Sequence, residues 1–299
     1  MNATHRAIIH MDGLTKDYGS THALSDLSLD VESGEIFGYL GPNGAGKTTT
    51  IRLLLDFIRP TRGSATIFGL DTRRESVAIR ERVGNLPGEL ALWNHMTGWE
   101  LVDYLGGLRG GVDKRYVGEL AERLDMDMKR RGKACSSGMK RKLGLIQALM
   151  HKPDLLILDE PTNGLDPLVQ QTFYRLMREI AQQGRTVFMS SHNLPEVEHV
   201  CDRVGILRAG KLVAVEKISS LKKVYFRWMT LRFDDGAQPA EFEALPGVSD
   251  VTAVNGSLRF RVSGELDPVI KLAARHHLTD MTYEEPSLET IFLDYYGEK

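Results

Sequence analysis

The chain has 299 residues, and at roughly 150 residues per domain this length predicts about two domains. Charged residues make up 26% and hydrophobic residues 42%, which excludes collagen-like, largely disordered and disulfide-rich proteins. The 38 lysines and arginines against 40 aspartates and glutamates give a net charge of −2, which argues against a protein that mainly coats nucleic acid.

The start of the chain alternates strand patterns, over residues 7–11, 24–31 and 36–40, with turns. A helix is predicted to open near Gly46 and to run through Leu55. Residues 76–150 then show apolar residues mostly at the three- and four-residue spacing of helices, and we interpret about 88–150 as a helical insertion. The clearest helical patterns there cover residues 100–108, 116–124 and 138–150. Further strands are predicted over residues 155–158, 186–189, 204–207 and 212–215.

The pattern changes after residue 221, so we expect one domain over residues 7–221 and a small α+β domain over residues 222–299. Its predicted order is β-α-β-β-α-β, with a final helix after it. The corresponding segments are residues 228–233, 242–245, a hairpin over 251–262 around Asn255-Gly256, 268–274, 281–283 and 288–295.

A glycine-rich loop lies between a predicted strand and a predicted helix, which makes the first part of the chain an α/β element. It matches the phosphate-binding pattern G-x-x-x-x-G-K-[ST] with Gly41, Pro42, Asn43, Gly44, Ala45, Gly46, Lys47 and Thr48. In such a loop the backbone N–H groups surround phosphate oxygens, and Lys47 neutralises the β- and γ-phosphates. We expect Thr48 to offer its hydroxyl to Mg²⁺ and Thr49 to bind the α-phosphate.

Two carboxylates end the apolar strand over residues 155–158. Asp159 is expected to hold Mg²⁺ and Glu160 to polarise the water that attacks the γ-phosphate, because phosphoryl transfer depends on positioning and charge neutralisation. The sequence therefore predicts an ATP- and Mg²⁺-dependent enzyme.

The chain resembles the nucleotide-binding subunit of an ABC transporter over about residues 7–220. The resemblance depends on three motifs in this order: the glycine loop, the segment Asp159–Pro167 and the pair Ser191-His192. The resemblance implies a P-loop NTPase (RecA-like) core with an antiparallel β subdomain and a helical insertion. Residues 135–139 resemble the family's signature motif, although Cys135, Ser137 and Met139 replace the usual Leu, Gly and Gln.

The resemblance assigns further roles. Ser136 and Gly138 of the signature bind the γ-phosphate held by the opposite subunit, and Asp166 couples the two sites. Tyr18 stacks on adenine, and His192 contacts the γ-phosphate. Gly88 stands where the family has a glutamine, so either Glu89 replaces it as the Mg²⁺ and water sensor or that contact is absent.

The implied function is ATP hydrolysis by a homodimer that drives a separate membrane permease. The signature form, the short final domain and residues 286–293 resemble exporter ATPases for small hydrophobic or antibiotic-like compounds. Trp93 and Trp99 lie where the family forms its permease groove. We expect the protein to be cytoplasmic, to bind peripherally to the membrane and to bind no nucleic acid. The alternative functions are a soluble ABC ATPase that acts on ribosomes or DNA, and a regulatory nucleotide-binding module.

Overall fold

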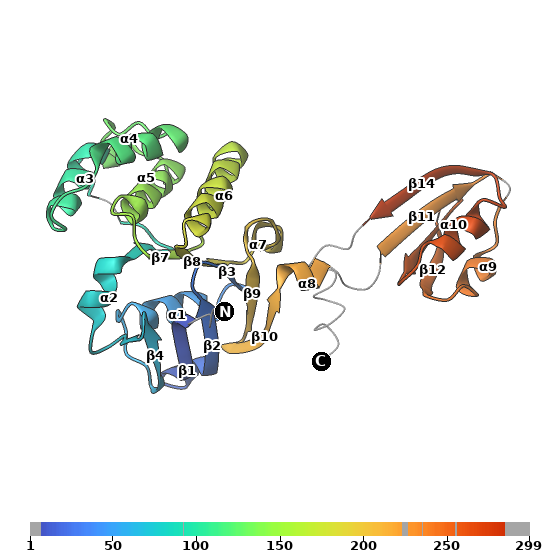
Figure 1. Cartoon of the computed structure of the whole chain (residues 1–299), viewed down its shortest axis with the longest axis horizontal. Coiled ribbons are helices and arrows are strands. Elements are labelled where there is room, and N and C mark those ends of the chain that lie inside the picture. The colour runs from blue at the N-terminus through green and yellow to red at the C-terminus, as the bar shows by residue number, and fades with distance from the viewer. Residues whose placement is uncertain (1–6, 92, 223–226, 235, 255, 285–299) are drawn as a thin grey trace, which may run out of the picture. The chain divides into compact units, whose positions relative to one another are not determined.

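The computed structural model describes residues 7–91, 93–222, 227–234, 236–254 and 256–284. The chain divides into two compact units, residues 1–218 and residues 219–299. The boundary predicted after residue 221 falls within helix α8 (Ile218–Lys222) and stays a prediction. Figure 1 labels the elements of both units.

A six-stranded sheet forms the centre of the first unit, in the order β10-β9-β3-β8-β7-β6. Its strands are β3 (Ile36–Leu40), β6 (Val83–Leu86), β7 (Leu155–Asp159), β8 (Thr186–Ser191), β9 (Arg203–Arg208) and β10 (Lys211–Lys217). All neighbours are parallel except β10, which pairs antiparallel with β9. Every residue of β3, β7 and β8 is buried, as expected for parallel strands that are covered on both faces.

Helices cover this sheet on two sides: Figure 1 shows α1 on one side and α5 and α6 on the other. The helices of the first unit that precede α8 are α1 (Lys47–Leu54), α2 (Ser76–Arg82), α3 (Gly98–Gly107), α4 (Lys114–Arg123), α5 (Ser137–Leu149), α6 (Pro167–Gln182) and α7 (Leu194–Val200), with a short 3₁₀ turn η1 (Gly132–Ala134) before α5. Tyr39 of β3 ties α1 to the sheet, because its buried hydroxyl lies 3.1 Å from that of Thr50. The glycine loop before α1 is thereby held on a rigid support.

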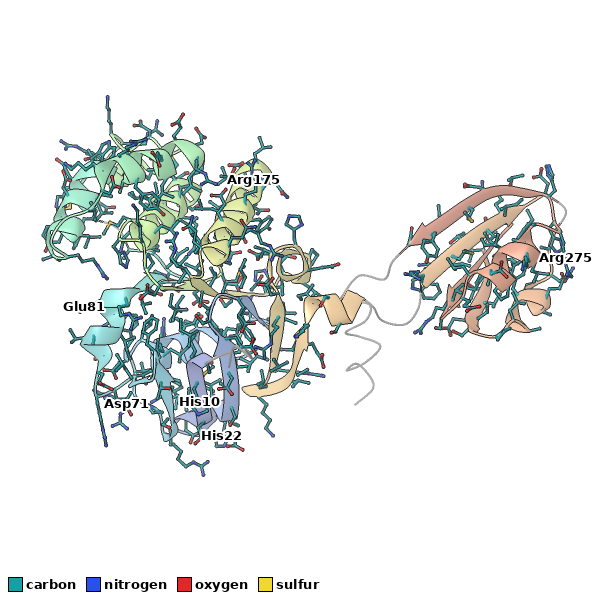
Figure 2. The ribbon with its side chains drawn as sticks, in the orientation of Figure 1. His10, His22, Asp71, Glu81, Arg175 and Arg275 are labelled. Carbon is teal, nitrogen blue, oxygen red and sulfur yellow. The ribbon has the colours of Figure 1, made fainter. Side chains whose placement is uncertain are left out.

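An antiparallel sheet in the order β2-β1-β4-β5 completes the first unit. Its strands are β1 (Ala7–Tyr18), β2 (Thr21–Glu32), β4 (Arg62–Ile67) and β5 (Leu70–Asp71). Apolar residues of β1 and β2 share one core with β3 and α1, so the two sheets are joined by a common interior. Polar pairs remain on its surface, such as His10 with Asp30 and His22 with Asp17; both histidines are labelled in Figure 2.

The predicted helices around 100–108, 116–124 and 138–150 are confirmed as α3, α4 and α5, but the mostly helical pattern of residues 76–150 did not predict strand β6. This strand has only four residues, and it contains Gly84 and Asn85, which weaken any apolar pattern. Gly84 permits the close approach of α5, since a Cβ there would lie 2.1 Å from the carbonyl oxygen of Ala148. In the described part of the chain, no helix is long and apolar enough to span a membrane.

The second unit is a four-stranded antiparallel sheet in the order β12-β13-β11-β14. Its elements are β11 (Arg227–Phe233), α9 (Pro239–Glu243), β12 (Val248–Val254), β13 (Ser257–Val262), α10 (Asp267–Ala273) and β14 (Leu278–Glu284). The predicted β-α-β-β-α-β order is confirmed, including the hairpin between β12 and β13. Phe242 and Phe260 are fully buried in its core. The helix predicted over residues 288–295 and the exporter-like segment 286–293 lie outside the described residues.

Candidate functional site

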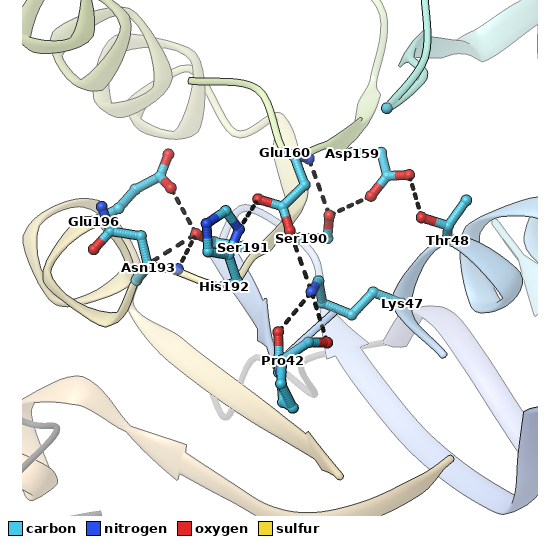
Figure 3. Close-up of polar contacts among 12 residues, drawn as sticks. Pro42, Lys47, Thr48, Asp159, Glu160, Ser190, Ser191, His192, Asn193 and Glu196 are labelled. Atoms are coloured by element: carbon cyan, nitrogen blue, oxygen red, sulfur yellow. Dashed lines mark hydrogen bonds and ion pairs between the residues drawn. The ribbon is translucent and has the colours of Figure 1, made fainter. Parts of the chain in front are cut away.

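The candidate site lies where three neighbouring parallel strands end. The glycine loop follows β3, Asp159 and Glu160 come at the end of β7, and Ser191 and His192 come at the end of β8. Because β3, β8 and β7 are adjacent and parallel, their carboxyl ends meet at one edge of the sheet. Figure 3 shows the polar contacts at this edge.

The glycine loop has the backbone geometry that the motif predicts. Gly44 and Gly46 have φ angles of 80° and 109°, in the left-handed region that glycine adopts readily. Space is also short, since a Cβ on Gly46 would lie 2.7 Å from the carbonyl oxygen of Ala23 and one on Gly41 would lie 2.5 Å from that of Leu207. The loop therefore needs glycine at positions 41 and 46 to reach the N-terminus of α1.

Lys47 is buried at the start of α1 and points back into the loop. Its Nζ donates to the carbonyl oxygens of Gly41 at 2.6 Å and Pro42 at 3.2 Å. The same nitrogen lies 3.2 Å from Oε1 of Glu160. The ammonium group thus connects the loop after β3 with the acid after β7.

Thr48 and Asp159 bring together the oxygen donors predicted for Mg²⁺. The Thr48 hydroxyl donates to Oδ2 of Asp159 at 2.7 Å, and Asp159 is buried. The other carboxylate oxygen, Oδ1, accepts a short hydrogen bond from Ser190. Hydroxyl and carboxylate oxygens are the hard ligands that Mg²⁺ prefers, so the donor set fits this ion.

Glu160 has a strained backbone and a carboxylate that lies between His192 and Lys47. Its φ of 50° lies in the left-handed region, which non-glycine residues enter at a cost and which is common at functional sites. Oε2 accepts from Nδ1 of His192 at 2.7 Å. Oε1 is buried and, among the described residues, forms no hydrogen bond; it forms an ion pair with Lys47 at 3.2 Å. Once Lys47 binds another anion, this oxygen can accept a hydrogen bond from a water molecule.

A second buried acid, Glu196 of α7, supports the turn that carries His192. Ser191 Oγ donates to Oε2 of Glu196 at 2.6 Å and accepts from the N–H of Asn193 at 2.9 Å. Burial raises the pKa of Glu196 above its ordinary value, while the hydrogen bond from Ser191 opposes that rise. Sequence reasoning missed Glu196 because an acid inside an amphipathic helix looks like an exposed one.

The signature residues begin α5. Ser136 is the N-cap, and its hydroxyl accepts from the N–H of Met139 at 3.3 Å. Gly138 packs against the loop after β7, since a Cβ there would lie 2.5 Å from the carbonyl oxygen of Gly164. Among the described residues, neither Ser136 nor Gly138 forms a hydrogen bond with the glycine loop. The structure thus does not bring the signature and the glycine loop of one chain into hydrogen-bonding contact.

Asp166 and Tyr18 lie at the ends of their elements. Asp166 is the N-cap of α6 and accepts from the N–H of Val169 at 3.0 Å. This hydrogen bond lowers the pKa of Asp166. Tyr18 ends β1 with its side chain 48% exposed, and Lys16 Nζ lies 4.9 Å from the ring centre. Thr49 follows Thr48 within α1.

Gly88 lies against the site where the family pattern has a glutamine. A Cβ on Gly88 would lie 2.9 Å from Oδ2 of Asp159, so the carboxylate leaves no room for a side chain at this position. Arg141 of α5, which is buried, fixes this loop by donating to the carbonyl oxygens of Pro87 and Gly88, each at 2.8 Å. Burial lowers the pKa of Arg141, and the carboxylates of Asp159 and Glu160 oppose that shift. This contact was also missed from sequence.

Glu89 is exposed and lies in a groove rather than among the oxygen donors. Within the described chain it forms no hydrogen bond or ion pair with Thr48 or Asp159, and its sensor role stays a prediction. The groove exposes Phe57 and Leu108 and is lined by Glu89, Arg109 and His151. Trp93 and Trp99 are not among its lining residues, and their expected place in a permease groove stays a prediction. Trp93 packs edge-on against Tyr104 with ring centres 5.2 Å apart.

One family model, several relatives and several solved structures are similar to this chain. The model of the ABC transporter family matches residues 24–163. The bacitracin transport ATP-binding protein BcrA of Enterococcus faecalis is 34% identical over 95% of each chain. The solved structure of an ATP-binding subunit of an ABC transporter is 27% identical, with a TM-score of 0.68 over 72% of this chain and 92% of that one. A dimeric bacterial ABC transporter cassette, 22% identical, has the same fold with a TM-score of 0.65 over 70% of this chain and 98% of that one.

Proposed function

Because the chain belongs to the ABC transporter family, as an ATPase that hydrolyses ATP to drive transport, we propose that it powers the export of an antibiotic-like compound through a separate permease. The observation that most supports ATP hydrolysis is the meeting of Lys47, Glu160 and His192 at one edge of the parallel sheet. These are a phosphate-binding cation, an acid whose buried Oε1 faces that cation, and an imidazole that orients the acid. The arrangement suits phosphoryl transfer to water.

The glycine loop supplies the nucleotide site. Its backbone N–H groups and the N-terminus of α1 favour phosphate, and Lys47 adds a mobile positive charge. Tyr18 offers an exposed ring face for a base. Thr48 and Asp159 would hold Mg²⁺, which neutralises charge on the phosphates when it is bound.

Glu160 is the residue that we assign to the attacking water. A carboxylate within reach of that water accepts its proton as the bond to phosphorus forms. His192 holds Oε2 of Glu160, so that Oε1 is the oxygen left for this work. Lys47 can exchange its ion pair with Glu160 for the phosphates.

Two chains are needed for a complete site in this proposal. Ser136 and Gly138 start α5 and have no hydrogen bond with the glycine loop among the described residues, so they would meet the γ-phosphate of a second chain. A helix N-terminus with a serine cap suits that contact. The dimeric cassette of the same fold supports this arrangement.

The groove beside Glu89 is our candidate for permease docking. Exposed Phe57 and Leu108 offer apolar contact, and Glu89 and Arg109 offer charge at its rim. The loop that lines it also passes close to Asp159 at Gly88, so docking there can influence the Mg²⁺ ligand. We therefore propose that the chain acts on the cytoplasmic face of the membrane.

The test is reconstitution of the chain with a candidate permease in lipid vesicles. We expect ATP hydrolysis to rise when the permease is present and bacitracin or a similar compound to move in an ATP-dependent way. Hydrolysis that responds instead to ribosomes or DNA would contradict the transporter role. A chain that binds ATP and never hydrolyses it would indicate a regulatory module.

A further inference from the structure

Ser190 of β8 lies between the two acids of the site and is fully buried. Its hydroxyl donates to Oδ1 of Asp159 and accepts from the backbone N–H of Glu160 at 3.0 Å. Figure 3 shows this chain of contacts running on to Thr48, which binds the other oxygen of Asp159. One hydroxyl group therefore joins the candidate Mg²⁺ ligand to the residue assigned to the attacking water.

We propose that Ser190 is a positioning residue that fixes both acids for ATP hydrolysis. The proposal rests on the function proposed above and adds to it a residue outside the loop, strand-end and histidine motifs.

The first consequence concerns Asp159. With Ser190 on Oδ1 and Thr48 on Oδ2, both carboxylate oxygens are held, and the carboxylate cannot rotate away from Thr48. Groups that orient a metal ligand matter nearly as much as the ligand, and losing one typically costs about 10- to 100-fold in metal affinity or activity. Without the Ser190 hydroxyl, we expect Mg²⁺ to be bound less well.

The second consequence concerns Glu160. Its φ of 50° is an unfavourable conformation for a residue with a side chain, and the hydrogen bond from its N–H to Ser190 helps to hold it there. If the backbone relaxes, the carboxylate shifts with it, and the water is no longer aligned with the phosphate. Hydrolysis should then fall even when nucleotide is bound.

Thr186 provides a matched control on the same strand. It is also fully buried, and its hydroxyl accepts from a backbone N–H, that of Gly34, at 2.9 Å. It lies at the opposite end of β8 from the site. Thr186→Ala removes a buried hydrogen bond of the same kind without touching either acid.

The experiment compares wild type, Ser190→Ala, Ser190→Thr and Thr186→Ala in the full chain. Binding of a non-hydrolysable ATP analogue is measured by calorimetry with EDTA and with Mg²⁺, and kcat and KM for ATP are measured separately. For Ser190→Ala we expect the affinity for the analogue in EDTA to be unchanged. The increase in this affinity on adding Mg²⁺ should be about 10-fold smaller than in wild type, and kcat should be about 10- to 100-fold lower. Ser190→Thr restores the hydroxyl and should recover much of both.

Thr186→Ala should lower the melting temperature. It should leave kcat, and the increase in analogue affinity caused by Mg²⁺, near the wild-type values. Equal behaviour of Ser190→Ala and Thr186→Ala in both measurements would overturn the proposal, because the hydroxyl would then be structural only. If Ser190→Thr folds poorly, Ser190→Cys keeps the side-chain size, and a partial recovery of kcat over Ser190→Ala would support the proposal. A wild-type chain that binds no analogue at all would overturn the proposed function itself.

Discussion

Glu160 Oε2 lies 2.7 Å from Nδ1 of His192, so the acid that follows β7 and the imidazole that follows β8 form one unit. The Glu160 side chain is 15% exposed and that of His192 is 46% exposed, so the acid is mostly buried and the imidazole faces solvent. The imidazole is therefore the more accessible member of the pair, and we expect an incoming phosphate to reach it first. Movement of His192 on contact with phosphate would be passed directly to Glu160.

Lys47→Ala tests the nucleotide site. The substitution removes the cation that binds Gly41, Pro42 and Glu160 and leaves the loop backbone in place. We expect weaker ATP binding and a loss of most hydrolysis, measured by calorimetry and phosphate release. Hydrolysis at the wild-type rate would show that the phosphates bind elsewhere.

Glu89→Ala tests the link between the groove and the site. Since Glu89 lines the groove and the same loop passes close to Asp159 at Gly88, permease-stimulated hydrolysis should fall far more than ATP binding. Glu122→Ala, an exposed acid on α4, is the control and should leave stimulation intact. Equal stimulation in both variants would mean that Glu89 is only a solvated acid.

Arg141→Lys tests the clamp on the loop at Gly88. An ammonium group keeps the charge but does not reproduce two parallel hydrogen bonds to consecutive carbonyl groups. We expect a loss of about 1–3 kcal/mol in the free energy of unfolding, because a buried acceptor is left without its partner. Arg123→Lys removes an exposed two-point pair with Glu179 and should cost under about 1 kcal/mol. The free energy of unfolding of each variant is measured by urea titration. If Arg141→Lys loses no more of it than Arg123→Lys does, the two hydrogen bonds of Arg141 do not stabilise this loop.

His151→Gln tests the pH dependence of stability. Burial lowers the pKa of His151 to about 4 from 6.5, and the nearby Arg109 adds to this effect. Between these two values the unfolded chain binds a proton at His151 that the folded chain does not, so this residue makes stability fall as the pH falls from about 6.5 to 4. The variant should lose less melting temperature over that window than wild type.

His22→Gln, at an exposed histidine on β2, serves as the control for this series. If wild type and His151→Gln lose the same melting temperature over this pH window, other groups are responsible for the pH dependence.

The sequence predicted most of the fold and the three strand-end motifs because their information is local. A glycine loop, two acids after an apolar strand and a histidine after the next strand each occupy a few consecutive residues. Parallel strand order then brings them together without further detail. Strand β6 was missed because four residues with a glycine and an asparagine carry too little pattern.

Ser190, Arg141 and Glu196 were missed for a different reason. Ser190 contacts Asp159 across 31 positions of the chain, and Arg141 contacts Gly88 across 53. Serine in a strand and arginine in a helix are ordinary residues there, and only the folded backbone shows which partners they meet. Residues that support a site are accordingly harder to predict than those that carry its motif.

Glu160→Gln in the presence of Mg²⁺ and ATP tests the central claim most directly. The change keeps the size of the side chain and removes its charge, and loss of a general base typically slows a reaction by about 10²- to 10⁴-fold. With the γ-phosphate retained between Lys47 of one chain and Ser136 of the other, the dimer should persist, because a ligand that binds only the dimer stabilises it. We expect light scattering to show a lasting dimer, alone or beside the permease, while wild type returns to monomer as ATP is consumed. Normal turnover by Glu160→Gln would contradict the role of Glu160, and a monomer at saturating ATP even with the permease would contradict the shared site.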